Sequence, residues 1–163
     1  MAEERGGSYL TPPDMKSVFL KISCHGDSRG VGSTLDYLTF RELGDLMKPH
    51  LRDRRLFLSA CEVAREELAA AVMECDGCYS VIGPVDEIGF SDAAIMWASF
   101  YHLVFKEDGR SMNRDRVSRA LQKVCEAFGT SVCYFRRTTT APYFRSTTFR
   151  PTDDDAQQRC DDE

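Results

Sequence analysis

His25 and Cys61 are the two residues of this chain whose types and positions best fit covalent chemistry. Each follows a short run of apolar and β-branched residues, LKIS before the histidine and LFLS before the cysteine, and such runs predict buried strands. An imidazole near a thiol can take its proton, and the thiolate that remains is a strong nucleophile. If the two strands are neighbours, both side chains project into one crevice at their carboxyl ends.

Gly26 extends this pattern, because a residue without a side chain leaves its backbone N–H open to a developing oxyanion. Cys61 is also expected to begin the next helix, whose N-terminus favours an anion. The spacing alone is weak evidence, since seven cysteines and three histidines offer several such pairs. A lone buried cysteine is more often an inert core residue.

Strands and helices alternate along the sequence in a way that would position these residues. Thr39 and Glu42 have the spacing of a capping box, and Asn113 is expected to cap the last helix. The alternation predicts an α/β protein with a parallel sheet flanked by helices. The predicted strands are 18–23, 54–61, 78–83, 131–135 and 142–149, and helices are expected from Thr39, Val63, Ser91 and Asn113.

One domain is expected over residues 17–150. Residues 1–16 mix glycine, proline and charge and indicate a flexible lead-in, whereas residues 151–163 form an acidic tail that is too poor in apolar residues to pack. The stretch GDSRGVGST, which begins at Gly26, contains three glycines and is expected to be a mobile loop at the rim of a substrate cleft.

Composition and charge argue against several classes of protein. The chain of 163 residues is 42% hydrophobic, which fits a globular protein, and no apolar run is long enough to span a membrane. A net charge of −5 argues against nucleic-acid binding, and the N-terminal residues lack the apolar core of a secretion signal, which favours the cytoplasm. The arginines of residues 134–150 are interpreted as the solvated face of a β-hairpin.

Neither a metal nor a cofactor is expected. Cys75 and Cys78 have the spacing of a zinc or redox pair, but the sequence offers no second pair of ligands, and the two cysteines lie between a helix end and a strand. An odd number of cysteines in a cytoplasmic chain is best interpreted as free thiols.

The segments SCHGD and LFLSACE, whose histidine and cysteine are 36 residues apart, resemble the caspase-like cysteine peptidases of the CHAT type. This family is related to the caspases and to separase. The following CYSVIGPVDEIGFSDAAIMWASFYHLVF resembles the family's next strand and buried helix, so the resemblance covers roughly residues 18–105. It implies a caspase-like three-layer sandwich, apparently short of the usual N-terminal strand–helix units.

The resemblance also implies the roles of the site residues. His25 would be the general base, Cys61 the nucleophile and the Gly26 backbone part of the oxyanion hole. Asp86, or failing that Asp92, would bind a basic side chain before the scissile bond, with arginine preferred to lysine. The implied function is a cysteine endopeptidase in a bacterial regulatory or defence pathway.

The roles of Asp86 and Asp92, and the partner at the sheet edge, each have an alternative interpretation. Asp86 could simply face solvent, Asp92 could charge a helix N-terminus, and Pro84 stands where the family usually has a tryptophan before the acid. The expected partner is a protein or peptide substrate, with no nucleic acid and no membrane. An open sheet edge could recruit a second copy or a regulatory protein, and a catalytically inactive or zymogen-like module acting through such an interaction is the alternative function.

Overall fold

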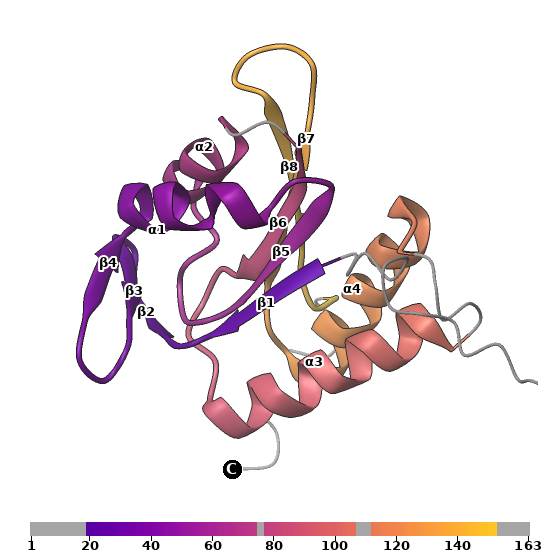
Figure 1. Ribbon diagram of the computed structural model, residues 1–163. Helices are drawn as coiled ribbons and strands as arrows, with labels where there is room; N and C mark the ends of the chain where they lie inside the picture. Colours follow the sequence, from indigo (N-terminus) through magenta and orange to yellow (C-terminus); the bar gives the residue numbers. More distant parts are fainter. Residues whose placement is uncertain (1–18, 75–76, 107–111, 153–163) are drawn as a thin grey trace, which may run out of the picture.

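A five-stranded mixed sheet forms the centre of the protein (Figure 1). In the order in which they pair, its strands are β1 (Phe19–Ser23), β5 (Arg54–Ser59), β6 (Cys78–Pro84), β7 (Val132–Arg137) and β8 (Phe144–Phe149). The computed structural model describes residues 19–74, 77–106 and 112–152. The pairs β1–β5 and β5–β6 are parallel, whereas β7 is antiparallel to both of its neighbours. The strands that carry the predicted dyad are therefore adjacent.

Helices cover both faces of this sheet. They are α1 (Phe40–Met47), α2 (Glu66–Met73), α3 (Phe90–Phe105) and α4 (Arg114–Phe128). The first two pack together on one face and the last two on the other (Figure 1). Side chains alternate along β5, so Leu56 and Leu58 join the core under α1 and α2, while Phe57 joins the core under α3 and α4. The predicted α/β class, with helices flanking the sheet, is confirmed.

A small antiparallel sheet follows β1. Its strands are β2 (His25–Gly26), β3 (Gly30–Gly32) and β4 (Tyr37–Thr39). The Asp27 carboxylate fixes the turn after β2, because it accepts hydrogen bonds from the backbone N–H groups of Arg29 (2.7 Å) and Gly30 (3.1 Å). It also accepts one from the Tyr37 hydroxyl (2.8 Å), and these bonds, led by the one from Arg29, lower the pKa of Asp27. The stretch GDSRGVGST, expected to be a loop, therefore contains the end of β2 and the whole of β3.

The starts of α3 and α4 can be compared with the helix starts predicted from the sequence. The Asn113 side chain accepts a hydrogen bond from the Arg116 N–H (2.9 Å), so the predicted cap of α4 is confirmed. The helix expected from Ser91, α3, begins one residue earlier, at Phe90, with Gly89 as its N-cap and no side-chain cap hydrogen bond. Ser91 instead lies inside the first turn.

The strand β1 forms one edge of the five-stranded sheet. In the described part of the chain it pairs only with β5, and β8, which pairs only with β7, forms the other edge. The predicted lead-in, residues 1–16, and residues 153–163 of the predicted tail lie outside the described residues. None of the described helices is both long and apolar enough to cross a membrane.

The capping box at the start of α1 is present as predicted. The Thr39 hydroxyl accepts a hydrogen bond from the Glu42 N–H (3.3 Å), and the Glu42 carboxylate accepts one from the Thr39 N–H (2.9 Å). This box fixes the point at which the chain leaves the small sheet and enters α1.

Replacement of Thr39 by alanine should lower the free energy of unfolding by about 1 kcal/mol, because the Glu42 N–H loses its acceptor. Urea denaturation at pH 7 measures the loss, and Thr39→Ser, which keeps the hydroxyl, should lose clearly less. The hydrogen bonds from Thr39 lower the pKa of Glu42 from its usual 4.5, so the contribution of the box should be complete above pH 4.5 and disappear as the pH falls below it. Equal losses in both variants would contradict the capping role.

Candidate active site

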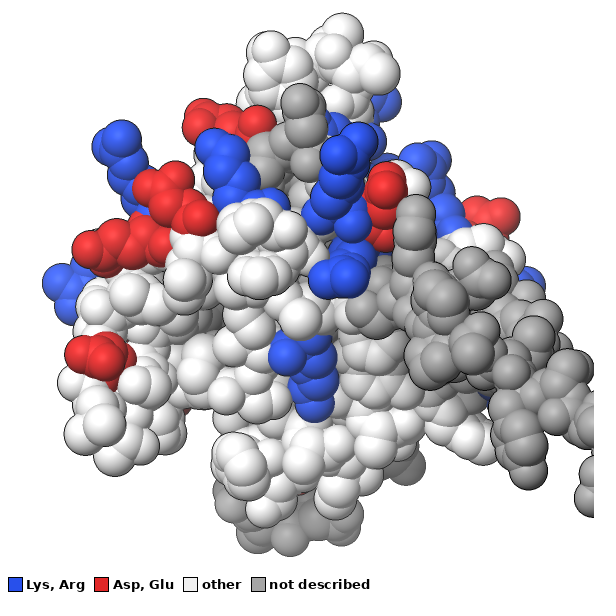
Figure 2. Space-filling view, in the orientation of Figure 1, with Lys and Arg blue, Asp and Glu red and all other residues white. Residues whose placement is uncertain are grey.

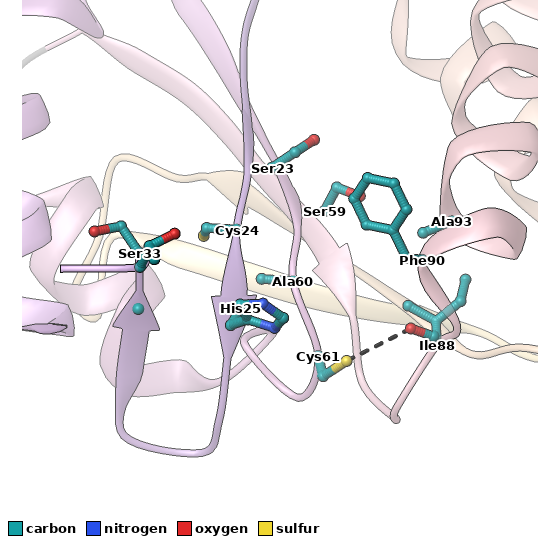
Figure 3. A pocket seen from close by; sticks show the side chains of 12 residues that line it. Ser23, Cys24, His25, Ser33, Ser59, Ala60, Cys61, Ile88, Phe90 and Ala93 are labelled. Carbon is teal, nitrogen blue, oxygen red and sulfur yellow. Dashed lines mark hydrogen bonds between the residues drawn. The ribbon is translucent and has the colours of Figure 1, made fainter. Parts of the chain in front are cut away.

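A cavity of about 420 Å³ lies at the carboxyl ends of β1 and β5. The small sheet closes it on one side and the start of α3 on the other (Figure 3). The structure places His25 and Cys61 together in its wall, as the sequence predicted. The residues that line the cavity are Ser23, Cys24, His25, Gly32, Ser33, Thr34, Ser59, Ala60, Cys61, Ile88, Phe90 and Ala93.

The pairing of β1 with β5 positions both reactive side chains. The two strands run in register to Ser23 and Ser59, and the Cys24 N–H donates to the Ser59 carbonyl (3.2 Å), which extends the pairing by one residue. His25 then begins β2 with an exposed side chain. Cys61 lies two residues beyond the end of β5 and is half-buried.

The turn after Cys61 bends across the end of β6. Glu62 has a φ of 54°, in the left-handed region, so the chain cannot continue as a helix at this point. The Glu62 N–H donates to the Asp86 carbonyl (3.4 Å), and the Ala64 N–H donates to the Pro84 carbonyl (3.1 Å). The expectation that Cys61 begins a helix was therefore wrong, because α2 starts only at Glu66.

The Cys61 thiol is not hydrogen-bonded to His25 in this structure. Its sulfur donates to the Ile88 carbonyl oxygen at 3.6 Å and points toward Ile88 rather than toward the imidazole ring (Figure 3). Catalytic hydrogen bonds are often long or misaligned without substrate, so the two groups can still act as base and nucleophile. Their reaction requires the thiol to leave the Ile88 carbonyl and turn toward His25.

The backbone of Gly26 lies against the turn that carries the cysteine. A Cβ atom at Gly26 would lie 2.8 Å from the Cys61 carbonyl oxygen and 2.9 Å from the Ala60 Cβ, so the two segments touch without room for a side chain. In the antiparallel pairing of β2 with β3, hydrogen-bonded residue pairs alternate with pairs that exchange no hydrogen bond. The Asp27 N–H donates to the Gly30 carbonyl (3.1 Å), so Asp27 and Gly30 form a hydrogen-bonded pair. The preceding pair, Gly26 with Val31, is then the open one. The Gly26 N–H therefore points away from β3, as an oxyanion donor would need.

A second thiol, that of Cys24, also lines the cavity. Cys24 packs against the core under α1 and α2 and also borders the cavity. Burial raises the pKa of this thiol, which lowers the fraction of thiolate. Burial also raises the pKa of Cys125 to about 12, so neither thiol fits the role of nucleophile.

The two predicted specificity acids do not line the cavity. Asp86 and Asp92 are both exposed, and the Asp92 carboxylate turns back toward Gly89, where a Cβ atom would lie 3.3 Å from its Oδ2. That position, in the first turn of α3, is favourable for a negative charge. Both acids flank the segment that supplies Ile88 and Phe90 to the cavity wall.

Sequence reasoning missed Ile88 and Phe90 as parts of the site. The Phe90 side chain is 86% exposed, although it borders the cavity and begins a helix whose buried residues include Trp97 and Phe100. Helical spacing offered no signal, because Phe90 lies three and seven residues before the buried Ala93 and Trp97 and so falls on the apolar face of α3. Such an exposed aromatic ring beside a cavity is available to contact a ligand.

No protein-family model matches the chain, and no curated protein matches its sequence. Among the described residues, no group of three or more His, Cys, Asp or Glu side chains could hold a metal ion. The assignment of the site therefore depends on its own geometry.

Proposed function

We propose that the protein is a cysteine endopeptidase of the caspase-like, CHAT type, with His25 and Cys61 as its catalytic dyad. The observation that carries the proposal is that two adjacent parallel strands bring these residues, 36 positions apart in the chain, to one cavity. The CHAT-type segments SCHGD and LFLSACE occupy the ends of those two strands. The same resemblance supports a role in a bacterial regulatory or defence pathway.

The proposed reaction proceeds through a thioester. His25 takes the thiol proton, and the Cys61 sulfur forms a bond to the carbonyl carbon of the scissile peptide, whose oxygen becomes an oxyanion facing the Gly26 N–H. The C–N bond then breaks as the imidazolium gives its proton to the leaving amine. Water, deprotonated by His25, attacks the thioester, and the C–S bond breaks to release the carboxylic acid product and the thiol.

The proposed substrate has a basic residue, arginine rather than lysine, before the scissile bond. Because the cavity lining contains no carboxylate, this preference would come from its rim, where Asp86 and Asp92 flank Ile88 and Phe90. The Asp86 carbonyl accepts a hydrogen bond from Glu62, the residue after the nucleophile, so Asp86 is the better placed of the two acids.

A peptidyl acyloxymethyl ketone tests both parts of this proposal. The probe with arginine at its reactive end should modify Cys61, identified by peptide mass spectrometry, and Cys61→Ala should remove this labelling. An otherwise identical norleucine probe should react about tenfold more slowly, and Asp86→Asn should abolish that difference. Glu87→Gln, which removes a neighbouring exposed carboxylate, is the matched control and should keep it.

The possible outcomes separate the activity from the specificity. Labelling of Cys61 at equal rates by both probes would reject the arginine preference and leave the peptidase proposal standing. Absence of Cys61 labelling, in a protein whose other thiols react with iodoacetamide after unfolding, would reject the peptidase proposal.

The outer edge of β1, which pairs with no strand among the described residues, favours a second candidate function, that of an inactive or zymogen-like module that binds a protein partner. Unpaired strand edges recruit further strands, from a second copy or a regulatory protein. An unreactive Cys61 together with self-association at micromolar concentration, measured by analytical ultracentrifugation, would favour this candidate over the peptidase.

A further inference from the structure

A second cavity, of about 230 Å³, is lined entirely by arginine and tyrosine side chains. It lies at the amino ends of β5 and β6, the end of the sheet opposite the cavity with His25 and Cys61. Figure 2 shows that many lysine and arginine side chains, with acidic side chains between them, lie at the end of the molecule from which the β7–β8 hairpin projects. The residues lining this arginine cavity are Arg55, Tyr79, Arg114, Tyr134, Arg136 and Arg137.

The register of four strands brings three arginines into one row. Arg55 lies opposite Ser80, Ser80 lies opposite Arg136, and Arg136 lies opposite Arg145. Directly opposed side chains share a face of the sheet, and opposed like charges are unfavourable unless something neutralises them. Because Ser80 is fully buried and uncharged, this row accumulates positive charge without a carboxylate of its own.

The hydrogen bonds of Arg55 are all to neutral groups. Its guanidinium donates to the Ser80 hydroxyl (2.9 Å), to the Tyr134 hydroxyl (3.0 Å) and to the Met112 carbonyl (2.9 Å). These bonds hold the group rigidly without cancelling its charge. A guanidinium fixed in this way is preorganised for an anion.

Arg136 borders the same cavity and has an unused hydrogen-bond donor. Its Nε atom is buried and has no hydrogen-bond partner in the described part of the chain, while its guanidinium lies 5.8 Å from the centre of the Tyr134 ring. A buried N–H without an acceptor is costly, and an incoming ligand oxygen would satisfy it.

A β-bulge shapes the remaining wall. Arg54 pairs with Cys78 but Arg55 pairs with Ser80, so Tyr79 is an extra residue in β6. Bulges redirect side chains, and here the ring of Tyr79 borders the cavity while its hydroxyl donates to the Asp53 carboxylate (3.3 Å). The nearby acid is therefore engaged by a tyrosine and not by Arg55 or Arg136.

We propose that the arginine cavity binds the phosphate groups of a small phosphorylated ligand. Four guanidinium groups surround this cavity, which is more positive charge than a ligand with one carboxylate would neutralise. The fork of each guanidinium also matches the oxygen atoms of a phosphate group. The volume lies below the range that encloses a drug-sized molecule, so it suits one or two phosphate groups, with any larger remainder outside. A net charge of −5 and a compact cavity rather than an extended basic stripe argue against nucleic acid as the occupant.

Pyrophosphate is the first probe, titrated calorimetrically into the full-length protein at low and at physiological salt. We expect saturable binding at one site, tighter than that of inorganic phosphate. Arg136→Gln and Arg114→Gln should each weaken it about tenfold, because each removes a charged donor. Arg41→Gln, at an exposed position on α1 in the opposite layer, is the matched control and should bind as the unaltered chain does.

A nucleoside triphosphate titrated in parallel identifies the source of the phosphate. Binding of both compounds with similar loss in Arg136→Gln would support recognition of the phosphate groups alone, while preferential nucleotide binding with the same loss would show that the remainder contributes. The proposal would be overturned by absence of pyrophosphate binding at millimolar concentration, by equal weakening in Arg41→Gln, or by binding of a single-stranded oligonucleotide alone. None of these results depends on peptidase activity.

Discussion

Replacement of Cys61 by alanine is expected to abolish hydrolysis of a fluorogenic arginyl peptide while the protein remains folded. The thiol is the only group in the proposed reaction that forms a bond to the substrate, so its loss should lower kcat by about 10⁴-fold or more. Cys61 is half-buried in a surface turn and packs in neither core, so the melting temperature should change little. Cys24→Ala, at the other thiol of the cavity, should retain turnover.

Replacement of His25 by alanine should reduce kcat by about 10²- to 10⁴-fold, because proton transfer to and from the reacting groups is lost. Its side chain is exposed, so the fold does not depend on it, and His50→Ala, at an exposed position before β5, is the matched control. If the two residues act as one unit, the double variant should be no slower than Cys61→Ala alone.

The catalytic dyad would be contradicted if the effects of replacing Cys61 and His25 on turnover were independent of each other. A residual rate in Cys61→Ala that falls further when His25 is removed would indicate another nucleophile. Unchanged turnover in His25→Ala would show that the imidazole does not take the thiol proton.

Local signals in the sequence were sufficient to predict most of the elements that hold the candidate site. The strand before His25, the strand before Cys61 and the capping box at Thr39 were all predicted from neighbouring residues, and the structure contains each of them. These elements were predictable because each depends on a few residues that are close in the chain. The adjacency of β1 and β5 was not predicted: the shared crevice was expected only if the two strands are neighbours, and the structure meets that condition.

The remaining features depend on contacts between distant residues. The small sheet forms because the Asp27 carboxylate binds Tyr37, ten positions away, which no hydropathy pattern indicates. The turn at Cys61 is fixed by Asp86 and Pro84 across the end of β6, so the expected helix start could not be corrected from local residues. The arginines of residues 134–150 were interpreted as solvated, whereas strand register brings Arg136 and Arg55, on either side of Ser80, to one cavity.

The second large effect is expected at Gly26, where alanine should both destabilise the protein and displace the nucleophile. An added Cβ atom would lie 2.5 Å from the Val63 Cγ1, besides its contacts with the Cys61 carbonyl and the Ala60 Cβ. Such separations are far below van der Waals contact, and all three atoms belong to the segment that carries the cysteine. Overpacking of this kind typically costs about 1–3 kcal/mol. Because Val63 is fully buried in the core under α1 and α2, it cannot withdraw freely, so β2 or the turn that carries Cys61 should move.

Gly32, in the neighbouring strand of the same small sheet, provides the matched control for stability. A Cβ atom there would meet the Tyr37 ring at 3.7 Å, an ordinary contact, so Gly32→Ala should unfold in urea at nearly the concentration required by the unaltered chain. Gly26→Ala should unfold at a lower concentration and label Cys61 more slowly with the arginyl probe, even under conditions where it is fully folded. A Gly26→Ala protein with unaltered stability and labelling would show that β2 can withdraw from the Cys61 turn, and the backbone N–H of Gly26 would then lose its place as oxyanion donor.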